Sequence, residues 1–258
     1  MTRAGLTRAG LTSVGRLGNL RRTIGALGTV AVLCASMAPA AAGALRPARS
    51  PSAPRSVGPS VIAQTKGSML SLFRSPSATK PFAVLNRTVG SGTPQVFLVS
   101  DATLAPYWLR IYLPSRPNES QAWVHASAVT LSSDPFRVAV DLSSHRLVVF
   151  DGSATRMTAV VGDGRPGLPT PTGTFYLVDL FRQSDASGEY GPFAFGLSAF
   201  SDVLESFGGG PGEIGLHGTN EPDSVGASLS HGCLRVQDAT ITALARLLPL
   251  GTPVVISQ

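Results

Sequence analysis

Short runs of apolar or alternating apolar and polar residues, divided by Gly, Pro, Ser and Asn, fill the chain between residues 61 and 131. Runs of this kind, with a period of two and turn residues between them, are typical of β-strands. We expect five short strands there, at Met69–Phe73, Pro81–Leu85, Gln95–Val99, Trp108–Leu113 and Ala122–Val129. So many short strands in about 70 residues predict a small β-barrel.

A second unit is expected to begin near Asp134. Apolar runs at 137–142 and 146–150 flank the turn Ser143-Ser144-His145 and predict a hairpin, and further strands are expected at 158–161, 174–180 and 253–256. Apolar residues with helical spacing follow Asp238, which we expect to cap a helix that ends at Pro249. The pattern therefore predicts a mainly β protein with one C-terminal helix.

The first 42 residues have the pattern of a secretory signal peptide. Five arginines and no acidic residue precede an apolar stretch at Thr23–Met37, and small residues suited to signal peptidase follow it. An uncleaved membrane anchor is the alternative, although the apolar stretch is shorter than the roughly 20 residues that a spanning helix needs. Residues 43–60 are rich in proline and read as an extended linker. We therefore expect export to the cell wall or periplasmic space, with a membrane anchor if the signal stays uncleaved.

The net charge of +6 is mostly a property of this leader. The remaining residues hold 16 of the 21 Lys and Arg residues and all 15 Asp and Glu residues, a net charge of +1. A nucleic-acid-binding surface would need a basic cluster in the folded part, and the sequence has none after Arg55. We therefore expect no nucleic-acid partner.

Cys233 stands out because cleavage of the leader would remove Cys34, the other cysteine of the chain. It lies in Ser230-His231-Gly232-Cys233-Leu234-Arg235, and twelve residues separate this segment from His217. A thiol becomes a useful nucleophile when a neighbouring base takes its proton, and either histidine could do so if the strand ending at His217 runs beside this loop. Gly232 would let consecutive backbone amides point at one spot, as an oxyanion hole requires. The alternative is that Cys233 is a small buried apolar residue.

At these residues the sequence resembles the L,D-transpeptidases with a YkuD-type catalytic domain. The resemblance extends over roughly Asp134 to Ile256, including Pro169–Tyr176, and it implies a β-sandwich or barrel with a thiol active site. By resemblance, Cys233 would be the nucleophile, His217 the general base and the Gly218 carbonyl the group that orients the imidazole. The Gly232 and Cys233 amides would hold the oxyanion, and Ser230, His231 and Arg235 would shape the site and meet substrate charge.

The segment 61–132 resembles the bacterial SH3-like domains of cell-wall proteins, through Trp108–Pro114, a polar turn and Ala122-Trp123-Val124. We expect Trp108 and Trp123 in the core of this barrel, with a ligand platform as the alternative. The expected order along the chain is thus a signal peptide at 1–42, a linker at 43–60, an SH3-like domain at 61–132 and a catalytic domain at 134–258.

The resemblance implies peptidoglycan stem peptides as substrates, a thioester acyl-enzyme formed with release of D-Ala, 3→3 cross-links as products and inhibition by carbapenem β-lactams. It implies no cofactor and no metal. An L,D-carboxypeptidase or another peptidoglycan hydrolase could use the same thiol, and a non-catalytic wall-binding protein or a zinc site at His217, His231 and Cys233 are further alternatives. The sequence departs from the family pattern in its short spacer and in Gly218, where some members have Ser. The family also tends to place an aromatic residue over the thiol, and Tyr190, Phe193, Phe195 and Phe200 compete for that place.

Overall fold

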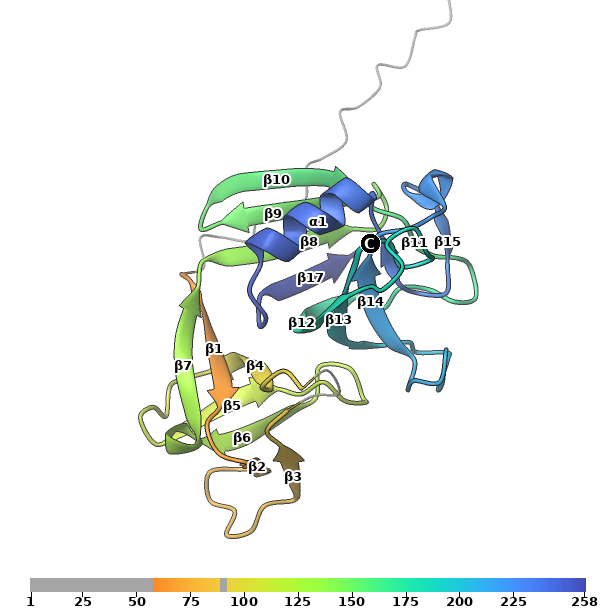
Figure 1. The fold of residues 1–258 in the computed structure, drawn as a ribbon. Coiled ribbons are helices and arrows are strands. Elements are labelled where there is room, and N and C mark those ends of the chain that lie inside the picture. Colours follow the sequence, from red (N-terminus) through yellow and green to blue (C-terminus); the bar gives the residue numbers. More distant parts are fainter. Residues whose placement is uncertain (1–57, 89–91) are drawn as a thin grey trace, which may run out of the picture. The chain divides into compact units, whose positions relative to one another are not determined.

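Mainly β-structure with one α-helix makes up residues 58–88 and 92–258, the part of the chain that the computed structural model describes (Figure 1). The predicted signal peptide and all of the predicted linker except residues 58–60 lie outside the described residues. Within the two described ranges, no helix has both the length and the apolar character needed to cross a membrane.

The N-terminal part is built on a five-stranded antiparallel sheet. Its strands, in spatial order, are β6 (Gln121–His125), β5 (Trp108–Tyr112), β4 (Val96–Asp101), β1 (Ser60–Thr65) and β7 (Val129–Asp134). A separate hairpin pairs β2 (Met69–Leu72) with β3 (Ala83–Asn86). The strand expected at Ala122–Val129 ends early, because the 3₁₀ turn η1 (Ala126–Ala128) separates β6 from β7. The likeness of this part to SH3-like domains stays a prediction.

The two tryptophans lie outside the N-terminal core, contrary to expectation. Side chains alternate along β5, so that Leu109 and Ile111 are fully buried while Trp108 is half-buried on the other face. Trp123 on β6 is half-buried in the same way, and the ring of Trp108 meets that of Phe73 edge to face at 5.2 Å. Aliphatic residues, and not the indoles, therefore fill the core of this sheet.

The C-terminal part is a curved eight-stranded sheet. In spatial order its strands are β10 (Ala154–Val160), β9 (Arg146–Asp151), β8 (Phe136–Asp141), β17 (Pro253–Ser257), β12 (Gly173–Arg182), β13 (Phe193–Phe200), β14 (Glu213–His217) and β16 (Leu234–Arg235). The expected hairpin is present as β8 and β9, and β17 joins the sheet parallel to β8. A short parallel pair, β11 (Asp163–Gly164) and β15 (Ser228–Ser230), and the 3₁₀ turn η2 (Pro222–Ser224) complete the part.

The single helix α1 (Asp238–Leu247) packs against β13 and β14. It begins one residue earlier than the expected cap implies, since Gln237 is the N-cap residue and makes no side-chain capping bond. The predicted cap at Asp238 is therefore wrong. The Asp238 carboxylate accepts a hydrogen bond from the backbone N–H of Thr219 at 2.9 Å instead, which ties the helix to the segment that follows β14.

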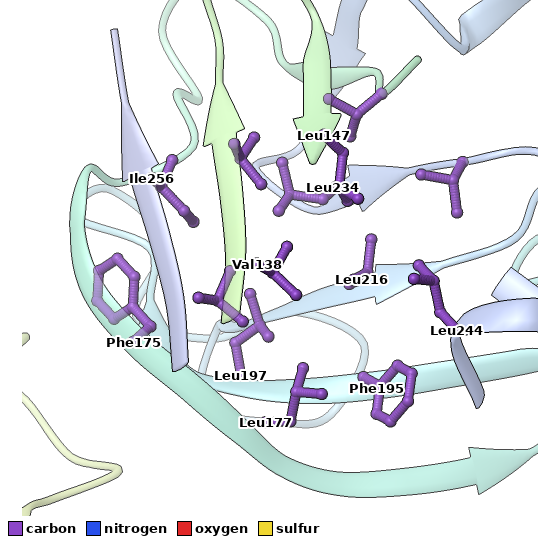
Figure 2. Close-up of a cluster of buried hydrophobic side chains, with 14 of the residues drawn as sticks. Val138, Leu147, Phe175, Leu177, Phe195, Leu197, Leu216, Leu234, Leu244 and Ile256 are labelled. Atoms are coloured by element: carbon purple, nitrogen blue, oxygen red, sulfur yellow. The ribbon is translucent and has the colours of Figure 1, made fainter. Parts of the chain in front are cut away.

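Two hydrophobic cores meet at β12. Phe175 and Leu177 point into the C-terminal core with Val138, Leu216 and other aliphatic residues, as Figure 2 shows. Tyr176 and Val178, which alternate with them, belong to the N-terminal core. A strand buried on both faces in this way makes the packing of each core depend on the other.

Candidate active site

Cys233 lies at the point where two segments of the motif run side by side. β14 and β16 pair in parallel, with Leu216 opposite Leu234 and His217 opposite Arg235. The strand that ends at His217 therefore runs beside the segment that holds Cys233, as the thiol mechanism requires. This register puts Cys233, immediately before β16, next to Gly215, whose N–H donates a hydrogen bond to the thiol sulfur at 3.3 Å. The thiol and His217 both line a pocket of about 370 Å³.

His217 is held as a neutral imidazole with a defined proton. It is buried, and its Nδ1 lies 2.5 Å from the carbonyl oxygen of Gly218. Because a carbonyl can only accept, Nδ1 carries the hydrogen, and the lone pair is on Nε2. Burial, joined by the charge of Arg235, lowers the pKa of His217 to about 4. The ring can therefore accept a proton at neutral pH.

The thiol is also uncharged at rest. Burial raises the pKa of Cys233 above its ordinary value, and the nearby carboxylates of Glu189 and Glu213 act in the same direction. The Gly215 N–H and the positive charge of Arg235 oppose this shift and do not overcome it. A buried thiol of this kind needs a base to take its proton before it can attack a carbonyl carbon.

Hydrogen bonds within the loop fix the backbone before Cys233. Ser230 Oγ accepts from the Gly232 N–H at 3.0 Å and donates to the Cys233 carbonyl at 2.7 Å. Gly232 has a φ of 119°, and a Cβ there would lie 3.0 Å from a methyl carbon of Ile214. The turn therefore requires glycine, and in this structure the Gly232 amide that was expected to face an oxyanion is engaged by Ser230.

Thr170, in the segment between β11 and β12, supports this turn. Its hydroxyl accepts from the Gly164 N–H at 2.9 Å and donates to the Gly232 carbonyl at 2.7 Å. Thr170 is buried, so this hydroxyl satisfies two backbone groups in the interior beside the thiol loop. No specific signal in the sequence pointed to Thr170, beyond its place in the Pro169–Tyr176 segment of the family resemblance.

The glycine at position 218 follows from close packing. A Cβ at Gly218 would stand 2.3 Å from Asp238 Oδ1 and 3.1 Å from the Cα of Gly191. The Asp238 carboxylate occupies the space that a serine side chain would need. The presence of Asp238 thus explains why residue 218 is glycine here and not the serine of some family members. Only the backbone carbonyl of residue 218 faces His217.

The two remaining candidate site residues, Arg235 and His231, differ in how deeply they are buried. Arg235 is buried and pairs with Glu221, with 2.6 Å between Nη1 and Oε2, so its charge acts on the thiol and the imidazole at a distance. His231 is half-buried, and its ring lies against that of Phe207 at 5.1 Å between centroids. His217, and not His231, lines the pocket with Cys233.

Two aromatic residues face the pocket from loops. Tyr190 lies 4.8 Å from the His217 ring between centroids and was one of four competing aromatics in the sequence. Phe207 was not among them, although it lines the same pocket. It lies in a Gly-rich loop without apolar periodicity, and sequence alone gives no signal that such a loop folds back over the thiol.

Glu213, at the start of β14, adds an acidic group to the pocket wall. Its carboxylate packs against Gly196 and lies near Asp179, and burial of the carboxyl together with the Asp179 charge raises its pKa to about 7. Within the described ranges, His, Cys, Asp and Glu side chains form no group of three or more that could hold a metal ion.

The C-terminal part of the chain is similar to known proteins. A family model described as the L,D-transpeptidase catalytic domain, YkuD, matches residues 135–256. A Bacillus subtilis (strain 168) protein assigned to the L,D-transpeptidases, YkuD, is 30% identical over 124 residues, which are 48% of this chain and 67% of that protein.

Two solved structures are also similar in part. L,D-transpeptidase 3 from Mycobacterium tuberculosis, in complex with a faropenem-derived adduct, has a TM-score of 0.43 and 13% identity over 64% of this chain and 91% of that chain. Bd1075 of Bdellovibrio bacteriovorus has a TM-score of 0.38 and 27% identity, and the match spans about half of either protein, 48% of each chain. From the matched domain and the Bacillus relative, the chain belongs to the YkuD family of L,D-transpeptidases.

Proposed function

We propose that this protein is a cysteine-dependent L,D-transpeptidase that joins peptidoglycan stem peptides through 3→3 cross-links. One observation carries the proposal: the Cys233 thiol and the His217 imidazole line the same pocket, and the imidazole is oriented by the Gly218 carbonyl. This pair suits an acyl transfer in which the imidazole takes the proton of the thiol during the attack. Membership in the family supports the choice of peptidoglycan as substrate.

In the proposed acylation, His217 Nε2 takes the proton of the Cys233 thiol as the sulfur bonds to the carbonyl carbon between the third residue and D-Ala. Backbone amides of the Cys233 loop stabilise the oxyanion, with the Gly232 amide taking part once the Ser230 hydroxyl turns away. The C–N bond then breaks, and the imidazolium returns its proton to the amine of D-Ala. A thioester and free D-Ala are the products of this half-reaction.

In the proposed second half-reaction, the Glu189 carboxylate near the thiol would attract a protonated side-chain amine of a neighbouring stem toward the pocket. The amine loses one proton to solvent, attacks the thioester carbon and gives a second proton to His217. The C–S bond breaks, and the sulfur recovers that second proton as a thiol. If water attacks instead, the same residues make the enzyme an L,D-carboxypeptidase.

Mass analysis of products formed from purified tetrapeptide muropeptides tests this function. We expect loss of D-Ala and a cross-linked dimer from the wild type, and no product from a folded Cys233→Ala variant. Formation of tripeptides without cross-linked dimers would show that the enzyme is an L,D-carboxypeptidase and not a transpeptidase. Binding to peptidoglycan without any product would favour the wall-binding alternative.

We also propose that the protein acts outside the cytoplasmic membrane after cleavage of its leader. The five arginines of residues 1–42 and the small residues at Ala38–Ala44 support this location. N-terminal sequencing of the cellular protein should find a mature end between Ala41 and Leu45. Recovery of residues 1–30 from the active protein would favour the anchored form.

A further inference from the structure

A loop of the C-terminal part forms one wall of the thiol pocket. It comprises residues 201–212 and connects β13 to β14. Phe207, Gly208, Gly210 and Pro211 of this loop line the pocket together with Cys233 and His217. At its tip, Phe207 and Gly210 exchange backbone hydrogen bonds of 3.0 and 2.9 Å. Between these two residues, Gly208 and Gly209 have φ values of 58° and 85°, in the left-handed region that favours glycine.

An arginine from the N-terminal part holds the base of this loop. Arg116 lies in the turn between β5 and β6, and its guanidinium donates to three loop carbonyls. These are the carbonyls of Ser201 at 2.5 Å, Leu204 at 2.8 Å and Pro211 at 2.9 Å. The same guanidinium lies over the ring of Phe200, 5.2 Å from its centroid. One side chain thus joins both ends of the loop.

Asn118, two residues further along the turn, holds the strand that enters the loop. Its amide donates to the Phe200 carbonyl at 2.8 Å, and its carbonyl accepts from the Phe200 N–H at 2.8 Å. This reciprocal pair replaces the strand partner that the end of β13 would otherwise need. A further bond joins Asn118 to the carboxylate of Asp202 at 3.2 Å.

The loop in turn contacts the motif around the thiol. Phe207 lies against His231, two residues before Cys233, with 5.1 Å between ring centroids. A shift of the loop base would therefore move a pocket wall and release a contact of the catalytic motif. Neither Arg116 nor Asn118 is among the residues that line the pocket.

We propose that Arg116 and Asn118 are positioning residues of the active site, which hold the loop 201–212 where it shapes the thiol pocket for large acyl donors. The N-terminal part thereby sets access to the thiol without touching it. The proposal rests on the proposed function only in taking Cys233 as the reacting thiol. It predicts that loss of the clamp affects large reagents far more than small ones.

The test compares two reagents on the full mature chain. Iodoacetamide is small and reports the reactivity of the Cys233 thiol, and a carbapenem such as meropenem must fit the pocket before it acylates. For Arg116→Ala we expect the acylation rate to fall by about 10- to 100-fold, since a displacement of about 1 Å can cost about 10²-fold. Iodoacetamide alkylation should stay within about twofold of the wild type on the same argument. Hydrogen exchange of amides 201–212 should rise.

Arg110→Ala is the matched control, because Arg110 is exposed on the same sheet and lies over Trp123, 6.0 Å from the ring centroid, away from the loop. It should change neither rate nor the exchange of the loop. Arg116→Lys, which keeps the charge and some donors, should recover part of the acylation rate. If Arg116→Ala does not fold, Asn118→Ser carries the same comparison.

Unchanged loop exchange in Arg116→Ala, or an equal loss of both reactions in a folded variant, would overturn the positioning role. Failure of the proposed function would give a different result. The wild type would then react with both reagents but convert no stem peptide, and the comparison of Arg116→Ala with the wild type would still test the positioning role.

Discussion

At the scale of single residues, burial decides the resting state of the two reacting groups. It raises the pKa of the Cys233 thiol and lowers that of His217 to about 4, so both shifts favour the neutral form. The site therefore rests as a thiol and an imidazole and not as a thiolate–imidazolium ion pair. Proton transfer is then part of the attack, and the Gly218 carbonyl matters because it fixes the acceptor nitrogen.

The pH dependence of alkylation tests this resting state. Only the thiolate reacts, and the raised pKa places its formation on the alkaline side, so iodoacetamide alkylation of Cys233 should rise by about tenfold per pH unit from neutral pH until it passes the ordinary thiol pKa of about 8.5. A rate already at its plateau near pH 6 would show an ion pair and contradict the neutral assignment.

Gly218 offers a second test among single residues. Since a Cβ there would stand 2.3 Å from Asp238 Oδ1, Gly218→Ala should destabilise the fold by about 1–3 kcal/mol and reduce activity. Addition of Asp238→Ala to Gly218→Ala should recover part of that stability, as measured by urea unfolding. Full stability of Gly218→Ala alone would show that the segment has room to move.

At the scale of elements, Thr170 links the strand pair β11–β15 to the thiol loop. Thr170→Val keeps the shape but leaves the half-buried Gly164 N–H and the buried Gly232 carbonyl without this partner, which should cost about 1–3 kcal/mol for the buried carbonyl and slow acylation. Thr170→Ser keeps the hydroxyl and serves as the control. Equal acylation rates for the valine and serine variants would remove Thr170 from the support of the loop.

Local pattern predicted the elements better than their partners. The hairpin β8–β9 and the helix could be predicted from the alternation and the helical spacing of apolar residues within short segments of the chain. The parallel pairing of β17 with β8 joins residues more than a hundred positions apart, and no local signal encodes it. β13, which holds the aromatic residues Phe193, Phe195 and Phe200, was not predicted as a strand, and these residues were considered only as candidates for the aromatic residue over the thiol.

The same reason explains where the site prediction stopped. Cys233, His217 and Gly218 lie within one recognisable motif, and the structure places Cys233 and His217 in one pocket with the Gly218 carbonyl beside the imidazole. Asp238 and Glu221 reach the motif from elsewhere in the chain, and Arg116 reaches a loop that lines the pocket, through contacts that depend on tertiary packing. The role of Asp238 was mistaken for a helix cap because aspartate at a helix start most often serves that purpose.

At the scale of the whole molecule, β12 couples the two cores. Tyr176 and Val178 belong to the N-terminal core, while Phe175 and Leu177 belong to the C-terminal one. A change at this strand should therefore unfold both parts together. Tyr176→Ala should cost about 3–5 kcal/mol, the usual range for loss of a large buried aromatic side chain.

Two probes in different parts can measure this coupling during urea unfolding. Both tryptophans, Trp108 and Trp123, lie in the N-terminal sheet, so fluorescence reports that part. Thiol accessibility of Cys233 reports the C-terminal part. The midpoints should coincide in the wild type and shift together in Tyr176→Ala. Separate transitions in the wild type would show that the cores fold independently.

The central claim is that His217 serves as the base for the Cys233 thiol, and the rate of covalent acylation tests it most directly. Intact-protein mass spectrometry can follow the addition of one carbapenem to wild type, His217→Ala and His231→Ala at neutral pH. We predict one adduct on Cys233, a rate about 10²–10⁴-fold lower for His217→Ala, and a smaller loss for His231→Ala. Equal rates for wild type and a folded His217→Ala variant would contradict the account and point to His231 as the base.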